Sequence, residues 1–427
     1  TLALTACDTW FGATKKNVLK GERVSVLAHE RALKPVPDLA EAVRLPPPRR
    51  NAAWPQSGGQ SGHAMHHLEL SDTIRRAWTS SAGSGSDSRD RLMNGPVVAD
   101  GRVFVMDTEA RVTAFDAKNG DRQWSVSLIP EGKDSASLMA GGLAFDKGRV
   151  FASSGFGEVA ALKADTGARI WRRTLGVPLR AAPTVSGERV FVVNKENELR
   201  ALAAEDGRDL WTHSGVVETA SLLGSPSPAV EAGVVVAAFS TGELIALKVE
   251  NGSVVWSDTL TAIRRTDAMS NMSDIRGQPV IDRGRVYSVG HSGIMVAIDL
   301  RTGLRLWELE AGGTHQPWIG GDYLYLLTND SELTAVEARS GRVVWVTPLQ
   351  NWEDPSDKDN RILWTGPALA SDRLIVAGSH GEALSISPYT GQILGREEMP
   401  AGVTIAPVIS DGTLYFLTDD ADLVAYR

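Results

Sequence analysis

The sequence predicts an all-β fold, an eight-bladed β-propeller built from four-stranded blades. Two observations predict it: a short unit of Ala, Gly and Trp recurs along the chain, and successive tryptophans of this unit are 38 to 51 residues apart. Such a period is typical of a propeller blade of four strands. With 42% hydrophobic and 22% charged residues, the 427-residue chain also has the apolar material that a folded core requires.

The repeated unit is clearest at Ala114, Gly120 and Trp124. Five more copies follow at Ala161, Gly167 and Trp171, at Ala201, Gly207 and Trp211, at Ala246, Gly252 and Trp256, at Ala297, Gly303 and Trp307, and at Ala335, Gly341 and Trp345. A seventh copy is degenerate, with Ser385, Gly391 and Gly395 in the three places. Because the tryptophan recurs at one position of the unit, we interpret it as a packing residue that docks between neighbouring blades.

Four strands can be placed in the first unit, over residues 96–99, 102–106, 111–116 and 123–127. The sequence Asp-Gly between the first two suits a tight hairpin, because both residues tolerate positive φ. A proline opens the first strand, where no backbone donor is needed. The corresponding strands of other units open at Pro183, Pro228, Pro279, Pro367 and Pro407.

Closure of the ring sets the blade number. Residues 423–427 form a third strand with no fourth strand after it, whereas residues 74–80 have the pattern of an outer strand. Pairing of these two segments completes an eighth blade and leaves no open edge between blades. The docking residues are then expected to be Trp78, Trp124, Trp171, Trp211, Trp256, Trp307 and Trp345.

Charge and hydropathy limit the partners. The net charge of −8 argues against nucleic acid, because the average field of the chain repels phosphates. No apolar run approaches the ~18 residues needed to cross a bilayer. We therefore expect any attachment to a membrane to be through a lipid anchor only.

The first residues indicate such an anchor. The stretch from Leu4 to Cys7 resembles the bacterial lipobox, in which the cysteine thiol is acylated; a free or buried cysteine is the alternative. Asp8 resembles the signal that retains lipoproteins in the inner membrane, so that location is the alternative to the outer membrane. The expected organisation is a signal-peptide remnant over residues 1–6, a largely extended tether over 7–70 and the propeller over 71–427.

The unit resembles the PQQ-like repeat, the tryptophan-docking blade of quinoprotein alcohol dehydrogenases, over roughly residues 72–427. It differs from a WD40 unit, because no repeat tryptophan precedes an aspartate. The dehydrogenases of that family hold their quinone with two adjacent cysteines and a calcium site. This chain has one cysteine, Cys7, and no matching acidic constellation. We therefore expect no cofactor and no catalytic residue.

Two polar clusters are weak candidates for a metal site. His63, His66 and His67 could bind a metal, although a solvated linker is favoured for this glycine-rich stretch. Carboxylates offer oxygens for calcium at Glu353, Asp354, Asp357 and Asp359, but their spacing matches no ordered calcium loop. We expect a solvated acidic loop there and no bound metal.

The connections between blades differ in length and point to a binding face. From Trp211 to Pro228, from Trp256 to Pro279 and from Trp345 to Pro367 the chain advances 17, 23 and 22 residues. The connection after Trp171 advances only 12 residues. Long loops on a rigid frame are where binding sites are commonly built, so we expect a protein partner at this face.

These features together resemble the BamB family of propeller lipoproteins, which belong to the machinery that assembles β-barrels in Gram-negative outer membranes. In that family two neighbouring loops contact the periplasmic POTRA domains of BamA, through a Ser-Leu-x-Leu-Arg-Gly stretch and a Ser-Asp-x-Asp stretch. Leu223 and Arg276 depart from these patterns. The matching positions are 219–224 in one loop and 273–276 in the other, and Ala220 also replaces a leucine of the pattern. The resemblance implies partner contacts at Ser221, Leu222, Leu223, Gly224, Ser273, Asp274, Ile275 and Arg276.

The resemblance implies a non-catalytic scaffold on the periplasmic face of the outer membrane. Its partners would be BamA, other subunits of the BAM complex and unfolded outer-membrane proteins. Two alternatives stay open: a PQQ-like repeat protein of the cell envelope with another partner, and a quinone-dependent dehydrogenase.

Overall fold

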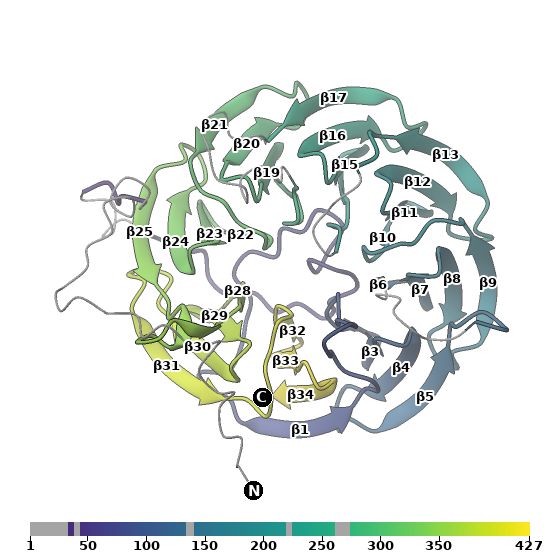
Figure 1. The fold of residues 1–427 in the computed structure, drawn as a ribbon, viewed down its shortest axis with the longest axis horizontal. Helices are drawn as coiled ribbons and strands as arrows, with labels where there is room; N and C mark the ends of the chain where they lie inside the picture. The colour runs from purple at the N-terminus through teal and green to yellow at the C-terminus, as the bar shows by residue number, and fades with distance from the viewer. Residues whose placement is uncertain (1–32, 38–42, 134–140, 219–223, 261–273) are drawn as a thin grey trace, which may run out of the picture. The chain divides into compact units, whose positions relative to one another are not determined.

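The computed structural model of the chain describes residues 33–37, 43–133, 141–218, 224–260 and 274–427. The chain divides into two units, 1–33 and 34–427, and the second contains every assigned strand. Eight sheets of four antiparallel strands form a ring in this unit (Figure 1). The described residues include no helix long and apolar enough to cross a membrane. The predicted eight-bladed propeller is confirmed.

The first four blades follow one another along the chain. Blade 1 contains β2 (Val97–Ala99), β3 (Arg102–Met106), β4 (Arg111–Asp116) and β5 (Arg122–Ser127). Blade 2 contains β6 (Gly142–Asp146), β7 (Arg149–Ser154), β8 (Glu158–Lys163) and β9 (Arg169–Thr174). Blade 3 contains β10 (Thr184–Ser186), β11 (Arg189–Val193), β12 (Glu198–Ala203) and β13 (Asp209–Ser214). Blade 4 contains β14 (Ala229–Glu231), β15 (Val234–Ala238), β16 (Glu243–Lys248) and β17 (Val254–Thr259).

The remaining blades complete the circle. Blade 5 contains β18 (Val280–Asp282), β19 (Arg285–Val289), β20 (Met295–Asp299) and β21 (Arg305–Leu309). Blade 6 contains β22 (Trp318–Gly320), β23 (Tyr323–Leu327), β24 (Glu332–Glu337) and β25 (Val343–Pro348). Blade 7 contains β28 (Trp364–Ala370), β29 (Arg373–Gly378), β30 (Glu382–Ile386) and β31 (Ile393–Glu398). A hairpin of β26 (Trp352–Asp354) and β27 (Asp359–Arg361) lies between blades 6 and 7 in the chain. It contains the acidic loop, whose residues are exposed.

Blade 8 closes the ring with strands from both ends of the described chain. It contains β32 (Val408–Ser410), β33 (Thr413–Leu417), β34 (Asp422–Tyr426) and, on the rim, β1 (Arg76–Ser81). The register places Trp78 opposite Ala425 and Ser81 opposite Asp422. Figure 1 shows β1 beside β34 at the rim. The predicted closure by an N-terminal strand is therefore present.

The repeated Ala, Gly and Trp surround one contact between blades. In blade 2, Trp171 pairs across the sheet with the small Ala161. Its indole lies against Gly207 of blade 3, where a Cβ would be 2.7 Å from Trp171 Cε3. The indole Nε1 also donates a hydrogen bond of 3.0 Å to the carbonyl of Ala204.

The other docking tryptophans repeat this arrangement. Trp78 lies against Gly120 of blade 1 in the same way, but its Nε1 has no acceptor among the described residues. Blade 7 has Gly395 in place of the tryptophan, and the residue opposite it is Ser385. Indole hydrogen bonds to the next blade join Trp124 to Ala164, Trp211 to Val249, Trp256 to Leu300, Trp307 to Ala338 and Trp345 to Pro388, at 2.7–3.1 Å.

Residues 49–71, which we call the inner segment, run around the axis of the ring inside the blades (Figure 1). Hydrogen bonds join this segment to all eight blades in turn. Its acceptors are the carbonyls of Asn51 for blade 8, Trp54 for blade 1, Pro55 for blade 2, Ser61 for blade 4, Gly62 for blade 5, His66 for blade 6 and Leu68 for blade 7. Gln56 bonds blade 3 through its side-chain Oε1, which accepts from Val185 N at 2.8 Å.

The inner segment corrects two expectations. His63 and His67 are 1% and 2% exposed, so the expected solvated linker around the three histidines is wrong. The compact unit also begins at Lys34, whereas the sequence placed a tether up to residue 70. Glycines and weak hydrophobic periodicity indicate an irregular backbone path. They fit an exposed tether and a buried segment inside the ring equally well, so they could not distinguish the two. At Gly59, with φ +90°, a Cβ would lie 2.4 Å from Met65 Sδ, so this glycine serves packing inside the protein.

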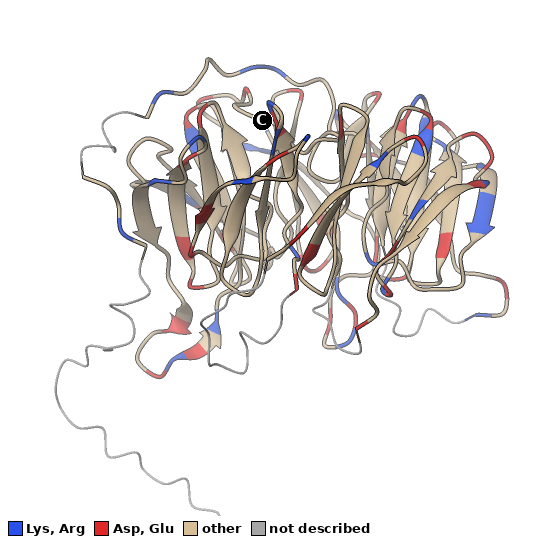
Figure 2. Cartoon of the chain, turned by 90° about the horizontal axis from the view of Figure 1, so that it is seen from above, with Lys and Arg blue, Asp and Glu red and all other residues tan. Residues whose placement is uncertain are grey.

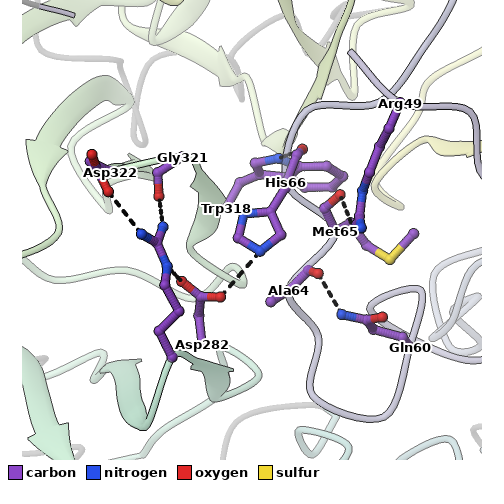
Figure 3. Close-up of polar contacts among 10 residues, drawn as sticks. Arg49, Gln60, Ala64, Met65, His66, Asp282, Trp318, Gly321 and Asp322 are labelled. Carbon is purple, nitrogen blue, oxygen red and sulfur yellow. Dashed lines mark hydrogen bonds and ion pairs between the residues drawn. The ribbon is translucent and has the colours of Figure 1, made fainter. Parts of the chain in front are cut away.

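A charged network ties the inner segment to blades 5 and 6 (Figure 3). His66 Nε2 lies 3.1 Å from the carboxylate of Asp282, which also accepts from Arg283 at 2.9 Å. Arg283 reaches Asp322 and the carbonyl of Gly321 in blade 6. Burial opposes ionisation of Asp282, but the hydrogen bonds from His66 and Arg283 outweigh it and lower the pKa of this carboxyl.

Replacing Trp171 with alanine is expected to lower the free energy of unfolding by about 3–5 kcal/mol, because it leaves a cavity between blades 2 and 3. Chemical denaturation measures the loss. Trp352→Ala is the matched control, since this tryptophan lies on hairpin strand β26 and is partly exposed. Equal losses in the two variants would contradict the docking role.

Deleting residues 421–427 removes β34 and opens the ring, because both β33 and β1 pair with that strand. We expect a large fall in melting temperature, measured by circular dichroism. The control deletes the equally long stretch 353–359 of the exposed hairpin. An unchanged melting temperature after loss of β34 would show that closure by β1 is not required.

Acid is expected to destabilise the fold through His63. Burial lowers the pKa of His63 to about 4, although its hydrogen bond to the carbonyl of Pro279 opposes the shift. The unfolded chain therefore binds this proton first, and stability falls as pH drops from about 6.5 towards 4, by about 3 kcal/mol for this group.

His63→Asn tests the contribution, since asparagine keeps a donor near the Nδ1 position and tolerates the observed φ of +64°. Urea unfolding from pH 7 to pH 4 should show a shallower decline for the variant than for the parent chain. Parallel declines would exclude His63 as the cause.

Candidate partner-binding site

The connections between blades gather at one face of the ring. Each blade runs outward from its innermost strand with the same topology, so the residues that precede the innermost strands share a face. The inner segment bonds to the middle of those strands, for example at Val98, Val230 and Ile281. We call the face that carries the residues before the innermost strands the connection face. Figure 2 shows the strands running between two faces, with acidic and basic residues interspersed over the blades.

A cavity of 440 Å³ lies on the axis at the connection face. Trp54, Ser57 and Gly58 of the inner segment line it, so the inner segment forms its floor. Trp54 is held there by stacking on Trp318, with ring centroids 6.1 Å apart. The remaining lining residues come from the connections that precede blades 1, 3, 4, 5, 6, 7 and 8 and from the innermost strands β22, β28 and β32.

The two loops identified by resemblance meet at this cavity. Gly224 and Arg276 both line it, although they are 52 residues apart in the chain. A Cβ on Gly224 would lie 3.6 Å from Arg276 Nε and 2.8 Å from Met93 Cε. Gly224 also has φ +89°, a conformation that favours glycine. The connections after β13 and β17 are therefore neighbours in space.

Two of the predicted contact residues are not available at the surface. Ile275 is fully buried and packs in the core shared by blades 4 and 5, so its expected role in binding a partner is wrong. Asp274 is 5% exposed and lines a small void beside Arg180 and Lys195. Sequence spacing could not separate these positions, because a connection turns from the surface into the core within a few residues.

Four more predicted contact residues lie outside the described part of the chain, and so does Cys7, the predicted lipidation site. The four are Ser221, Leu222, Leu223 and Ser273. The histidines and the acidic loop form no metal site among the described residues, where no group of three or more His, Cys, Asp or Glu side chains converges.

Positive charge gathers in the cavity. Arg91, Arg180 and Arg276 line it, and the described residues of its lining include no Asp or Glu. Burial and the nearby Arg276 lower the pKa of His315 to about 4, so this imidazole is neutral at pH 7. Desolvation lowers the pKa of Arg276, which Asp274 partly offsets, yet an arginine keeps its charge at pH 7. The cavity can thus attract and hold an anionic group.

A repeated position, missed in the sequence, supplies much of this lining. When the repeat units are aligned on the proline that opens the innermost strand, the residue three positions before this proline lines the axial cavity in most blades. An arginine recurs at this position, at Arg180 and Arg276, and this recurrence was the signal that could have found the site. The lining residues at this position are Met93, Arg180, Ser225, Arg276, Thr314 and Thr404.

Comparison with known proteins adds the family. A family model described as "Outer membrane protein assembly factor BamB" matches residues 71–139 and 133–347. A protein of that name from Alkalilimnicola ehrlichii is 30% identical over 372 residues, which is 86% of this chain and 93% of the relative.

Solved structures with the same fold include a relative and an enzyme. BamB from Moraxella catarrhalis superposes with a TM-score of 0.68 at 18% identity, over 83% of this chain and all of that one. The quinohemoprotein alcohol dehydrogenase ADHIIG from Pseudomonas putida HK5 gives 0.69 at 14% identity, over 88% of this chain and 80% of the enzyme. At these identities the two structures support the fold alone. The match of the family model and the extent of the curated relative show that this chain belongs to the BamB family of outer membrane protein assembly factors.

Proposed function

We propose that the chain is a non-catalytic scaffold of the outer-membrane β-barrel assembly complex. In this role its connection face binds the POTRA domains of a BamA-like subunit and helps to present unfolded outer-membrane proteins for insertion. The observation that carries the proposal is the meeting of Gly224 and Arg276, from the two loops identified by resemblance, at one open face. Loops held on a rigid ring suit a protein partner better than a reaction centre.

The names of the relatives support a scaffold. The matched relatives and the family model carry the name of an assembly factor. The dehydrogenase shares the fold at 14% identity, which is no evidence for its chemistry in this chain. A propeller of the cell envelope with a different partner is the remaining competitor, and direct binding separates it from the proposal.

The location follows from the same family. Relatives named as outer membrane assembly factors support a place at the periplasmic side of the outer membrane. A lipid on Cys7 would supply the attachment. Other BAM subunits would then contact surfaces of the same ring.

The first test is calorimetric binding of the purified full chain to the POTRA domains of the BamA protein from the same organism, at physiological salt. We expect saturable binding that Leu222→Asp weakens at least about tenfold, because a charge placed in an apolar anchor loses its burial. Arg276→Gln should weaken binding as well, through loss of a charged contact at the cavity rim.

The matched control is Arg301→Gln, which removes the same charge from an exposed turn after β20. The control should bind within about twofold of the parent chain, and melting temperatures of all variants should agree. Absence of binding to folded POTRA domains would refute the proposed partner.

A further inference from the structure

Among the described residues, the arginines of the axial cavity lack the ion-pair partners that several other arginines of the ring have. Arg172 pairs with Glu158, Arg305 with Asp258 and Arg342 with Glu337. In the described part of the chain, neither Arg91, Arg180 nor Arg276 forms an ion pair or a side-chain hydrogen bond. An arginine held in a concave site without an acceptor has unused hydrogen-bonding capacity.

Carboxylates near the cavity neutralise only part of the positive charge of its arginines. Asp274 is the carboxylate that acts on Arg276, but it is nearly buried and also lies beside Arg180 and Lys195 around a small void. One carboxylate therefore faces several cations there. Arg91, in the connection before blade 1, lies outside that group, and the carboxylate on which it acts is that of Asp87.

The remaining lining favours a ligand with an apolar body. Leu363 is 55% exposed and lines the cavity, and Met93 and Ile405 add further apolar surface. The volume of 440 Å³ is within the range of sites for small organic ligands and far exceeds the space that one inorganic anion fills. Because the inner segment forms the floor, entry is from the connection face.

We infer that the axial cavity is a socket for a short acidic peptide segment, whose carboxylates pair with Arg91, Arg180 and Arg276 while its apolar side chains contact Leu363 and Met93. Carboxylates fit the planar guanidinium better than other common protein groups do. The net charge of −8 repels extended polyanions, whereas a short segment can reach the local positive site. The inference deepens the proposed function and rests on it only for the face from which a partner would arrive.

The test uses the purified full chain and a short fluorescein-labelled peptide of alternating glutamate and leucine, followed by fluorescence anisotropy. We expect saturable one-to-one binding that weakens as NaCl is raised. The same peptide with glutamine in place of glutamate should bind at least about tenfold more weakly. No saturable binding of the acidic peptide would overturn the inference.

Variants assign the binding to the cavity. Arg180→Gln combined with Arg276→Gln should weaken peptide binding at least about tenfold. The control combines Arg122→Gln on β5 with Arg301→Gln, two exposed arginines outside the cavity lining, and should change binding less than about twofold. Equal losses in the two double variants would show attraction by the general field and refute the socket. If the first double variant melts earlier, the two single variants are compared instead.

Citrate separates a peptide from a free small carboxylate. We expect citrate to compete with the acidic peptide at millimolar concentrations, because it carries carboxylates without the apolar body. Binding of citrate with no binding of the peptide would overturn the assignment to a peptide. Since the assay contains no POTRA domain, its failure is distinguishable from failure of the proposed partner.

Discussion

The ring depends on one repeated contact, an indole of one blade packed against a glycine of the next. This contact explains why alanine, glycine and tryptophan recur in the repeat. The residue opposite the indole must be small, and the turn that faces the indole must lack a Cβ. Blade 7 lacks the indole, and there a different solution is found. One hydrophobic cluster joins blades 6, 7, 8 and 1 and includes Trp54, Met65 and Leu68 of the inner segment. The inner segment thus packs where the repeated contact is missing.

The inner segment also satisfies a requirement of any propeller. The innermost strand of each blade has one edge without a neighbouring strand, and backbone groups buried along that edge need partners. Carbonyls of the inner segment accept from Val98, Phe145, Val230 and Ile281 at 2.6–2.9 Å, and the side chain of Gln56 serves blade 3. The same segment that completes these edges forms the floor of the axial cavity, through Trp54, Ser57 and Gly58. Stability of the inner edges and the shape of the site are therefore one structural feature.

The sequence predicted the fold better than it predicted the candidate binding site. Blade number, strand positions and closure by an N-terminal strand follow from a repeated pattern with a clear physical cause, and the closing strand expected over residues 74–80 is Arg76–Ser81 in the structure. The inner segment was missed because its contacts are made by backbone carbonyls, which leave no pattern in side-chain type. Ile275 was misplaced for a related reason, since burial in a connection depends on the path of the chain. Arg180 could have been identified from its position three residues before a strand-opening proline. This position is recognised only when the repeat units are aligned on that proline.

Binding in the axial cavity would be linked to the stability of the whole ring. Residues from seven of the eight connections line the cavity, so the affinity of a ligand there would depend on the closed ring and would be lost when blades separate. Any such ligand stabilises the folded state in proportion to the logarithm of its concentration above the dissociation constant. The arginines of the cavity have the opposite effect in the free protein, because like charges held around a cavity repel one another. A bound segment that carries carboxylates relieves that repulsion. This relief adds to the binding free energy of the segment, independently of any other contacts that the partner makes.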